Sequence, residues 1–354
     1  PFVRLVHWKE LMRQPEYLQF GGMAVPEGVM MRSPNYYSVA CRAPNGEIIV
    51  KTEPLDKTFL GKLNWLKKPF LRGTLALLDT MAIGVRAMRF ASDIQLDARY
   101  AKPGEEVVPQ KNTKTLDNLA IAGTMIFSLA FGFFLFNVVP NGIAQFLGGD
   151  RAGADTRGLV TNYIAEVVKL VFFLGYLFLI RLLPPILDVF RYHGAEHKAI
   201  NSIENIGSVT AESAMAQTRL HPRCGTNFAI MVFIIGFLLN PLVPRYWLVG
   251  PELPVLTTLV RVLTELALLP LIAGISYEMI RAAGRAKNQR WVNILLAPGL
   301  WTQYITTEEP KEPHIEVAIR SLDAVMRAES TGEMENTISD IEPAVPTSGE
   351  SPTV

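Results

Sequence analysis

Cysteine is scarce in this sequence, whose 354 residues include only Cys41 and Cys224. Two cysteines are too few for a disulfide framework, so a reducing compartment is the simpler expectation. A large charge of one sign is also missing, because the formal net charge is +1, and nothing therefore points to a nucleic-acid partner. Residues 1–20 contain charges throughout and no long apolar run, which excludes a secretory signal there.

Apolar residues, by contrast, are abundant. The chain is 49% hydrophobic with a mean hydropathy of +0.22, yet 19% of its residues are charged. That mixture is typical of a membrane protein with sizeable water-facing parts. Four windows reach the length of about 20 apolar residues that a bilayer requires, and they lie at 118–138, 159–180, 226–239 with a continuation towards 249, and 255–276. We therefore predict a mainly α, polytopic membrane helix bundle of four spans.

The distribution of lysine and arginine predicts the orientation of these spans. There are 17 such residues before position 118, 5 in 181–225 and 7 from 277 onward, but only 2 in 139–158 and 1 in 240–254. By the positive-inside rule, the N-terminus, the 181–225 loop and the C-terminus are cytoplasmic. We expect a multi-pass protein of the cytoplasmic membrane.

Four charged residues lie inside the predicted spans. Glu166 and Lys169 are in the second span, and Arg261 and Glu265 are in the fourth. Because both spans run in the same direction, we predict the cross-helix pairs Glu166 with Arg261 and Lys169 with Glu265. Structural pairing is one interpretation, and an ion or proton path in a transporter is the alternative.

The water-facing parts divide into several regions. Residues 36–53 alternate apolar and polar side chains around Asn45 and Gly46, which predicts a β-hairpin. The preceding stretch GGMAVPEGVMMRSP has the composition of a loop whose glycines allow a close backbone approach. The predicted regions are an N-terminal cytoplasmic unit at 1–68, an interfacial amphipathic helix and linker at 69–117, the membrane bundle at 118–305, a cytoplasmic helix at 306–328 and a disordered acidic tail at 329–354.

The segment RYHGAEHKAIN, residues 191–201, contains two of the five histidines four positions apart. On a helix, His193 and His197 share one stripe, a spacing that fits two ligands of one zinc ion. With Glu196 they form the order H-x-x-E-H, the inverted zincin arrangement, in which the glutamate is the general base. Glu204 shares the stripe but lies about 16 Å along the axis, too far to bind the same metal.

A third ligand must come from elsewhere in the chain. HPRCGT, residues 221–226, offers His221 and Cys224 within one turn, and imidazole with thiolate suits zinc. Glu278, at the cytoplasmic end of the fourth span, is a further candidate ligand. The alternative is that His221 contacts lipid headgroups while Cys224 is a small buried residue.

The motifs GGMAVPEGVMMRSP, PFLRG, HGAEHKAIN, HPRCGTNF, SYE and TTEEP followed by EVAI occur in this order. Over about residues 20–325 the chain resembles the bacterial DUF1385 family, which has been labelled a predicted metal-dependent enzyme. The resemblance implies a multi-span membrane protein with a metal, and it supplies no reaction. Met23 stands where the family usually has Gln, and Pro26 where it usually has Met. If that Gln contacts substrate, Met23 implies a different specificity.

The leading hypothesis is a membrane protein with a cytoplasmic zinc site and metal-dependent hydrolytic activity on a lipid-like or membrane-protein substrate. His193 and His197, with His221 or Cys224, would hold the zinc. Glu196 would be the base, and Arg72 or Arg223 would stabilise a developing oxyanion. The alternatives are a non-enzymatic scaffold or assembly factor with a structural His/Cys cluster, and the transporter.

Overall fold

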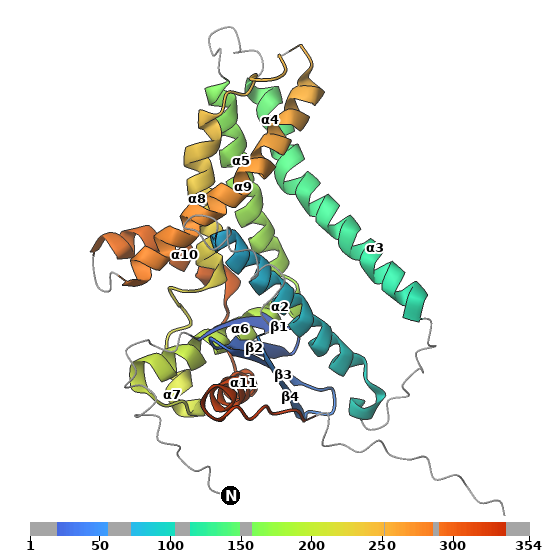
Figure 1. The fold of residues 1–354 in the computed structure, drawn as a ribbon, viewed down its shortest axis with the longest axis vertical. Helices are drawn as coiled ribbons and strands as arrows, with labels where there is room; N and C mark the ends of the chain where they lie inside the picture. The colour runs from blue at the N-terminus through green and yellow to red at the C-terminus, as the bar shows by residue number, and fades with distance from the viewer. Residues whose placement is uncertain are drawn as a thin grey trace, which may run out of the picture.

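The structure is a computed structural model, and it describes residues 20–55, 72–102, 114–148, 158–250, 252–285 and 290–337. The described chain is mainly α-helical, as predicted, with one four-stranded antiparallel sheet. Figure 1 shows a helix bundle at one end of the molecule and the sheet with its flanking helices at the other. The N-terminal sheet, the helices that follow the second span and the last helix therefore lie at the same end of the bundle.

Among the residues that the structure describes, four helical segments are long and apolar enough to cross a membrane, which confirms the predicted number. These spans are Ile126–Gly148, Leu159–Arg181, Gly225–Leu242 and Pro254–Ala282. The helices that form them are α3 (Lys114–Phe133) with α4 (Val139–Gly148), α5 (Leu159–Arg181), α8 (Gly225–Leu239) and α9 (Pro254–Arg285).

The first span ends ten residues later than the predicted boundary at 138. Residues 139–148, predicted to lie outside the bilayer, continue the helix through a π-helical turn at Phe134–Val138. Pro140 lacks an N–H group for the helical ladder, and a locally widened turn accommodates such a residue. The polar Asn141 is completely buried, because its side-chain oxygen and its carbonyl accept hydrogen bonds from Arg245 at 3.3 and 3.2 Å.

The sheet has the order β1-β2-β3-β4, and each strand pairs antiparallel with the next one in the sequence. Its strands are β1 (Gly21–Val25), β2 (Gly28–Arg32), β3 (Tyr36–Arg42) and β4 (Ile48–Pro54). The β3–β4 hairpin turns around Asn45 and Gly46, as predicted, with Gly46 at a φ of +94°. The preceding segment is a second hairpin and not a loop. The glycines of this segment made its sequence resemble a loop. Strand β2 is buried on both faces, so it lacks the alternation of apolar and polar residues that predicts a strand.

Helices cover both faces of this sheet (Figure 1). Helices α6 (Pro184–Ile206) and α11 (Glu312–Thr331) pack on one face, and α2 (Arg72–Leu96) packs on the other. The first turn of α2 also contacts the fourth span, where Thr74 donates a hydrogen bond to the Pro270 carbonyl at 3.1 Å. The short helix α7 (Ala211–Met215) packs against α6, and α10 (Arg290–Thr306) packs against α8.

One glycine in α6 allows a close approach to another segment. A Cβ atom at Gly194 would lie 2.2 Å from the Glu308 carbonyl oxygen, and the Glu308 amide donates to the Phe190 carbonyl at 2.9 Å. The glycine, a poor helix former, is therefore required because main chain crosses this face of α6.

The C-terminal boundary differs from the prediction. Helix α11 begins at Glu312 and ends at Thr331, and the residues after it pair with β4. Thr52 donates to the Glu335 carbonyl at 2.8 Å, and Thr337 donates to the Val50 carbonyl at 3.0 Å. The tail from 329 is therefore structured as far as 337, and 338–354 lie outside the described residues.

We expect truncation after Ala328 to destabilise the protein, whereas truncation after Thr337 should not. The shorter chain loses the pairing with β4 and the Glu329 carboxylate, which accepts hydrogen bonds from Ser33 at 2.7 Å and from the Asn35 side chain at 2.6 Å. Thermal unfolding of both detergent-solubilised chains measures the difference. Equal midpoints would show that this segment contributes nothing to the fold.

Gly194→Ala should lower the free energy of unfolding by about 1–3 kcal/mol, because a Cβ atom there overlaps main chain that cannot rotate away. Gly175→Ala in α5 is the matched control, since nothing lies within 4 Å of its Cβ position. The comparison requires the unfolding midpoints of both variants. If Gly194→Ala proves as stable as the control, the crossing of main chain over α6 is wrong.

Candidate metal centre

Two main-chain carbonyls orient the two histidines of α6. The Nδ1 atom of His193 donates to the Thr306 carbonyl at 2.8 Å, and the Nδ1 atom of His197 donates to the Arg219 carbonyl at 2.6 Å. A carbonyl can only accept, so both Nδ1 atoms carry the proton in the neutral rings. Both Nε2 atoms therefore present a lone pair, and the ring centroids are 4.5 Å apart.

Cys224 approaches the same point from the start of the third span. It is the N-cap of α8, and its Sγ atom lies 3.2 Å from the Nε2 atom of His193. The Thr226 amide donates to Sγ at 3.5 Å. The thiol is therefore held at the boundary between the bundle and the sheet layer.

Within the described part of the chain, His193, His197 and Cys224 form a group whose ligand atoms all lie within 4.8 Å of one another. Their donor set, two imidazole nitrogens and one sulfur, suits zinc. The Nε2 atom of His197 is buried and has no hydrogen-bond partner among the described residues. An unsatisfied buried acceptor costs about 1–3 kcal/mol, and a bound cation would remove that cost. Burial also lowers the pKa of His197 and so favours the neutral ring that ligates metal.

Glu196 lies beside this group with its carboxylate buried. Its Oε2 atom is 3.9 Å from the Nε2 atom of His193 and 4.0 Å from that of His197. The pKa of Glu196 is raised by burial, against the opposing effects of His193, His221 and the Gly22 amide, which hydrogen-bonds the carboxylate. Gly22 allows this contact, because a Cβ atom there would be 2.8 Å from Cγ of Glu196. Strand β1 thus closes one side of the site.

His221 lies outside the three-residue group. Its Nδ1 atom accepts from the Arg223 amide at 3.3 Å, so the proton of the neutral ring is on Nε2, which lies 3.5 Å from Oε2 of Glu204. Glu204 also pairs with the Arg223 guanidinium. Of the two third ligands that the sequence left open, the geometry brings Cys224 into the group. The Arg223 guanidinium pairs with Glu204. Glu204 therefore has a role other than binding the metal, as its distance along α6 predicted.

The remaining predicted site residues lie near the start of α2. Arg72 is the first residue of that helix, and its side chain lies outside the described part of the chain. Glu278 is on α9 next to Tyr277, whose Cβ atom would lie 2.6 Å from a Cβ at Gly73. Glu278 does not belong to the group of His193, His197 and Cys224.

Several residues that position the site were not identified from the sequence. Gln303 of α10 accepts from the His221 amide and donates to the His221 carbonyl, both at 2.8 Å. Asn201 donates to the Thr218 and Leu220 carbonyls at 2.8 and 3.1 Å, which holds the loop that contains Arg219. A polar Gln inside the apolar segment 290–306 was the available signal.

A second cluster of buried charges lies inside the bundle. Lys169 contacts Glu265 at 2.5 Å, as predicted, and also Glu166 on its own helix at 2.9 Å. The predicted pair between Glu166 and Arg261 is not formed. Arg261 binds Glu265 at 3.0 Å and the Asn240 carbonyl at 2.5 Å, because the chain after the third span brings carbonyl oxygens within its reach.

Comparison with known proteins places the chain among uncharacterised relatives. The family described as "Protein of unknown function (DUF1385)" matches residues 68–328. The chain is 34% identical over 327 residues to the uncharacterized protein YqhQ of Bacillus subtilis (strain 168), covering 89% of this chain and 94% of that protein. No solved structure matches. The chain thus belongs to the DUF1385 family.

Proposed function

We propose that this membrane protein binds zinc through His193, His197 and Cys224 and uses the site for hydrolysis. The observation that carries the proposal is the buried Nε2 lone pair of His197, which lies within 4.8 Å of the ligand atoms of His193 and Cys224 and accepts no hydrogen bond of normal geometry from the described residues. Three protein ligands are the number found in catalytic zinc sites, which keep a fourth position open. Bound zinc would supply Lewis acidity, polarising a substrate oxygen and lowering the pKa of water.

Glu196 is the proposed general base. Its Oε2 atom is nearly equidistant from the two Nε2 atoms, so it lies next to the position that a shared ligand of both rings would occupy. A carboxylate whose pKa is raised takes up a proton more readily near neutral pH. The Gly22 amide hydrogen-bonds this carboxylate and holds it in place.

The position of the site favours a substrate at the membrane surface. Cys224 immediately precedes the third span, which begins at Gly225. The His193 side chain is 16% exposed, whereas that of His197 is 1% exposed, so the group is reached from the side of His193. A lipid-like molecule or a segment of a membrane protein would meet the site there.

A closed structural centre is the second candidate, and the burial of Glu196 favours it. With 4% exposure, this carboxylate is shielded from bulk water and is close enough to complete a four-ligand cluster after a small movement. Such a centre would support a non-enzymatic scaffold or assembly factor. The two candidates differ in what Glu196→Gln does.

We further propose that the site end of the molecule is cytoplasmic and that the protein resides in the cytoplasmic membrane. The support is that the strands and helices α2, α6 and α11, which belong to the three lysine- and arginine-rich segments, lie at this end of the described chain (Figure 1). The opposite orientation would place most of the basic residues outside, against the positive-inside rule.

The first test distinguishes the proposed zinc ligands from the proposed general base. His193→Ala, His197→Ala and Cys224→Ala should lose the bound zinc, measured as metal per purified chain, from about one to near zero. Glu196→Gln should retain zinc while hydrolysis falls by about 10². His221→Ala should retain zinc because it lies outside the group.

The control for this series is His314→Ala, since His314 is a buried histidine of α11 that binds Asp188 at 3.1 Å and does not belong to the group of His193, His197 and Cys224. Zinc loss in the control alone, or in none of the variants, would contradict the metal site. Zinc loss in Glu196→Gln would favour the closed structural centre.

The orientation predicts the labelling of two introduced cysteines in intact cells. Thr210→Cys, at the N-cap of α7, should resist a membrane-impermeant maleimide, and Leu248→Cys, in the loop after the third span, should react. Both positions are exposed, whereas the native cysteines are buried and give little background. The reverse pattern would place the site outside.

A further inference from the structure

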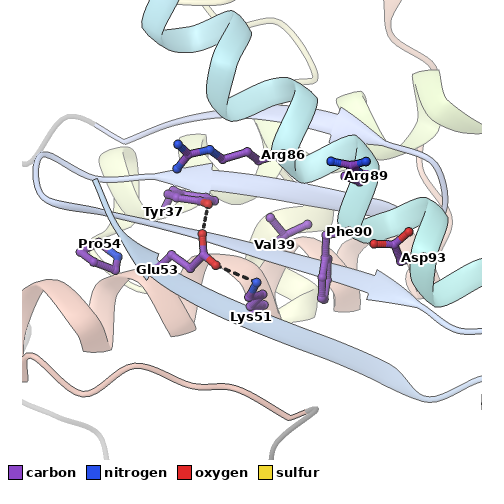
Figure 2. A pocket seen from close by; sticks show the side chains of 9 residues that line it. All are labelled: Tyr37, Val39, Lys51, Glu53, Pro54, Arg86, Arg89, Phe90 and Asp93. Carbon is purple, nitrogen blue, oxygen red and sulfur yellow. Dashed lines mark hydrogen bonds and ion pairs between the residues drawn. The ribbon is translucent and has the colours of Figure 1, made fainter. Parts of the chain in front are cut away.

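A cavity of about 560 Å³ lies on the face of the sheet that α2 covers, opposite the face that carries α6 and the histidines. Figure 2 shows α2 crossing the strands, with side chains from the helix and from β3 and β4 directed into the space between them. The lining residues are Tyr37, Val39, Lys51, Glu53, Pro54, Arg86, Arg89, Phe90 and Asp93. None of them belongs to the candidate metal centre.

Among the charged side chains that line this cavity, arginine is available to bind a ligand. Glu53 accepts a hydrogen bond from the Tyr37 hydroxyl and pairs with Lys51 at 2.7 Å, so its charge is already engaged (Figure 2). Arg86 lies close to the Tyr37 hydroxyl and the Glu53 carboxylate, so its guanidinium is already partly engaged (Figure 2). Arg89 is exposed and makes no hydrogen bond or ion pair with another residue of the described chain. Arg86 and Arg89 are three residues apart on α2 and both line the cavity, and each planar guanidinium presents N–H donors in a fork that suits phosphate oxygens.

The outer surface of α2 next to these arginines is apolar. Leu78, Met81, Val85 and Met88 are 40–56% exposed. At about 100° per residue they occupy one stripe about 80° wide, and Arg89 borders it while Arg86 follows towards the sheet. Helix α2 therefore has a buried face, an exposed apolar face and a cationic edge between them, as helices in a lipid interface do.

The depth of the cavity fits the headgroup layer. Gly73 packs against Ala273 and Tyr277, inside the span that ends at Ala282. From there α2 runs obliquely away from the bundle (Figure 1), and 13 residues to Arg86 correspond to about 20 Å. Ala273 and Tyr277 lie five to nine residues before Ala282, about 8–14 Å along the span. Arg86 therefore lies at most roughly 6–12 Å beyond the end of the span, a range that includes the polar headgroup region of roughly 5–8 Å.

We propose that the cavity between α2 and strands β3 and β4 binds the phosphate-bearing headgroup of an anionic membrane lipid. Arg86 and Arg89 hold the phosphate, and the acyl chains lie along Leu78, Met81 and Val85. Lys51 and Phe90, with Nζ 5.9 Å from the ring centroid, form the wall of β4 and α2 against which the headgroup rests. This site is independent of the proposed zinc chemistry.

The test titrates the full-length chain in neutral detergent with dioleoylphosphatidylglycerol and counts bound lipid by native mass spectrometry. Arg89→Gln should weaken binding about tenfold, and Arg89→Lys should weaken it less, because a point charge replaces the fork. Arg99→Gln is the control of equal charge change. Arg99 is exposed, lies outside the cavity and is paired with Asp97. Dioleoylphosphatidylcholine should bind weakly to all chains.

Two results would overturn the proposal. Equal affinity of Arg89→Gln, Arg99→Gln and the unaltered chain for phosphatidylglycerol would show that the cavity does not hold the headgroup. Glycerol phosphate or inorganic phosphate binding as tightly as the lipid would assign the cavity to a soluble phosphate compound. Because Arg89 has no hydrogen bond or ion pair with the residues that the structure describes, its substitution should leave the unfolding midpoint unchanged, which the same sample measures.

Discussion

Two hydrogen bonds from imidazole Nδ1 atoms to main-chain carbonyls determine what the centre of this protein can do. Thr306 and Arg219 provide these carbonyls, and their positions force the Nε2 lone pairs of His193 and His197 towards each other and towards Cys224. Oriented and neutral imidazoles are prepared to bind a metal ion, because such a second interaction fixes both the tautomer and the ring direction.

Much of the surrounding architecture serves to bring those carbonyls into place. Gly194 lets the segment after α10 cross α6 at contact distance, and Gly22 lets strand β1 reach the Glu196 carboxylate. Gln303 and Asn201 hold the loop between α7 and α8. The sheet, the last helix and the third span therefore meet at one short stretch of α6, and changes in any of them should be felt at the site.

The bundle contains a separate cluster of paired charges that links several of its segments. Lys169 joins both carboxylates, Glu166 and Glu265, and Arg261 joins Glu265 to main-chain carbonyls that follow the third span. Each charge has a close partner, which is how charged groups are tolerated at such depth. This network fixes α5 and α9 relative to the segment at the far end of α8.

The four spans, the hairpin at Asn45 and Gly46, and the helical stripe of His193 and His197 could be predicted from the sequence, because each depends on a local pattern of residues. Two features could not be predicted. The hairpin that ends at Arg32 has glycines and buried strands, and its sequence therefore resembles a loop. The helical extension to residue 148 depends on the long-range contact between Asn141 and Arg245. The choice between His221 and Cys224 depends on which ring nitrogen faces a backbone amide. Such long-range contacts leave no periodic signal.

Zinc K-edge absorption spectroscopy of the purified full-length protein tests the central claim most directly. If His193, His197 and Cys224 hold the ion, the fitted first shell should contain one sulfur at about 2.3 Å, two imidazole nitrogens at about 2.0–2.1 Å and a further light atom. The Cys224→Ala protein should lack the sulfur component. A zinc-loaded protein whose first shell has no sulfur, or a purified chain that retains no zinc at all, would contradict the account.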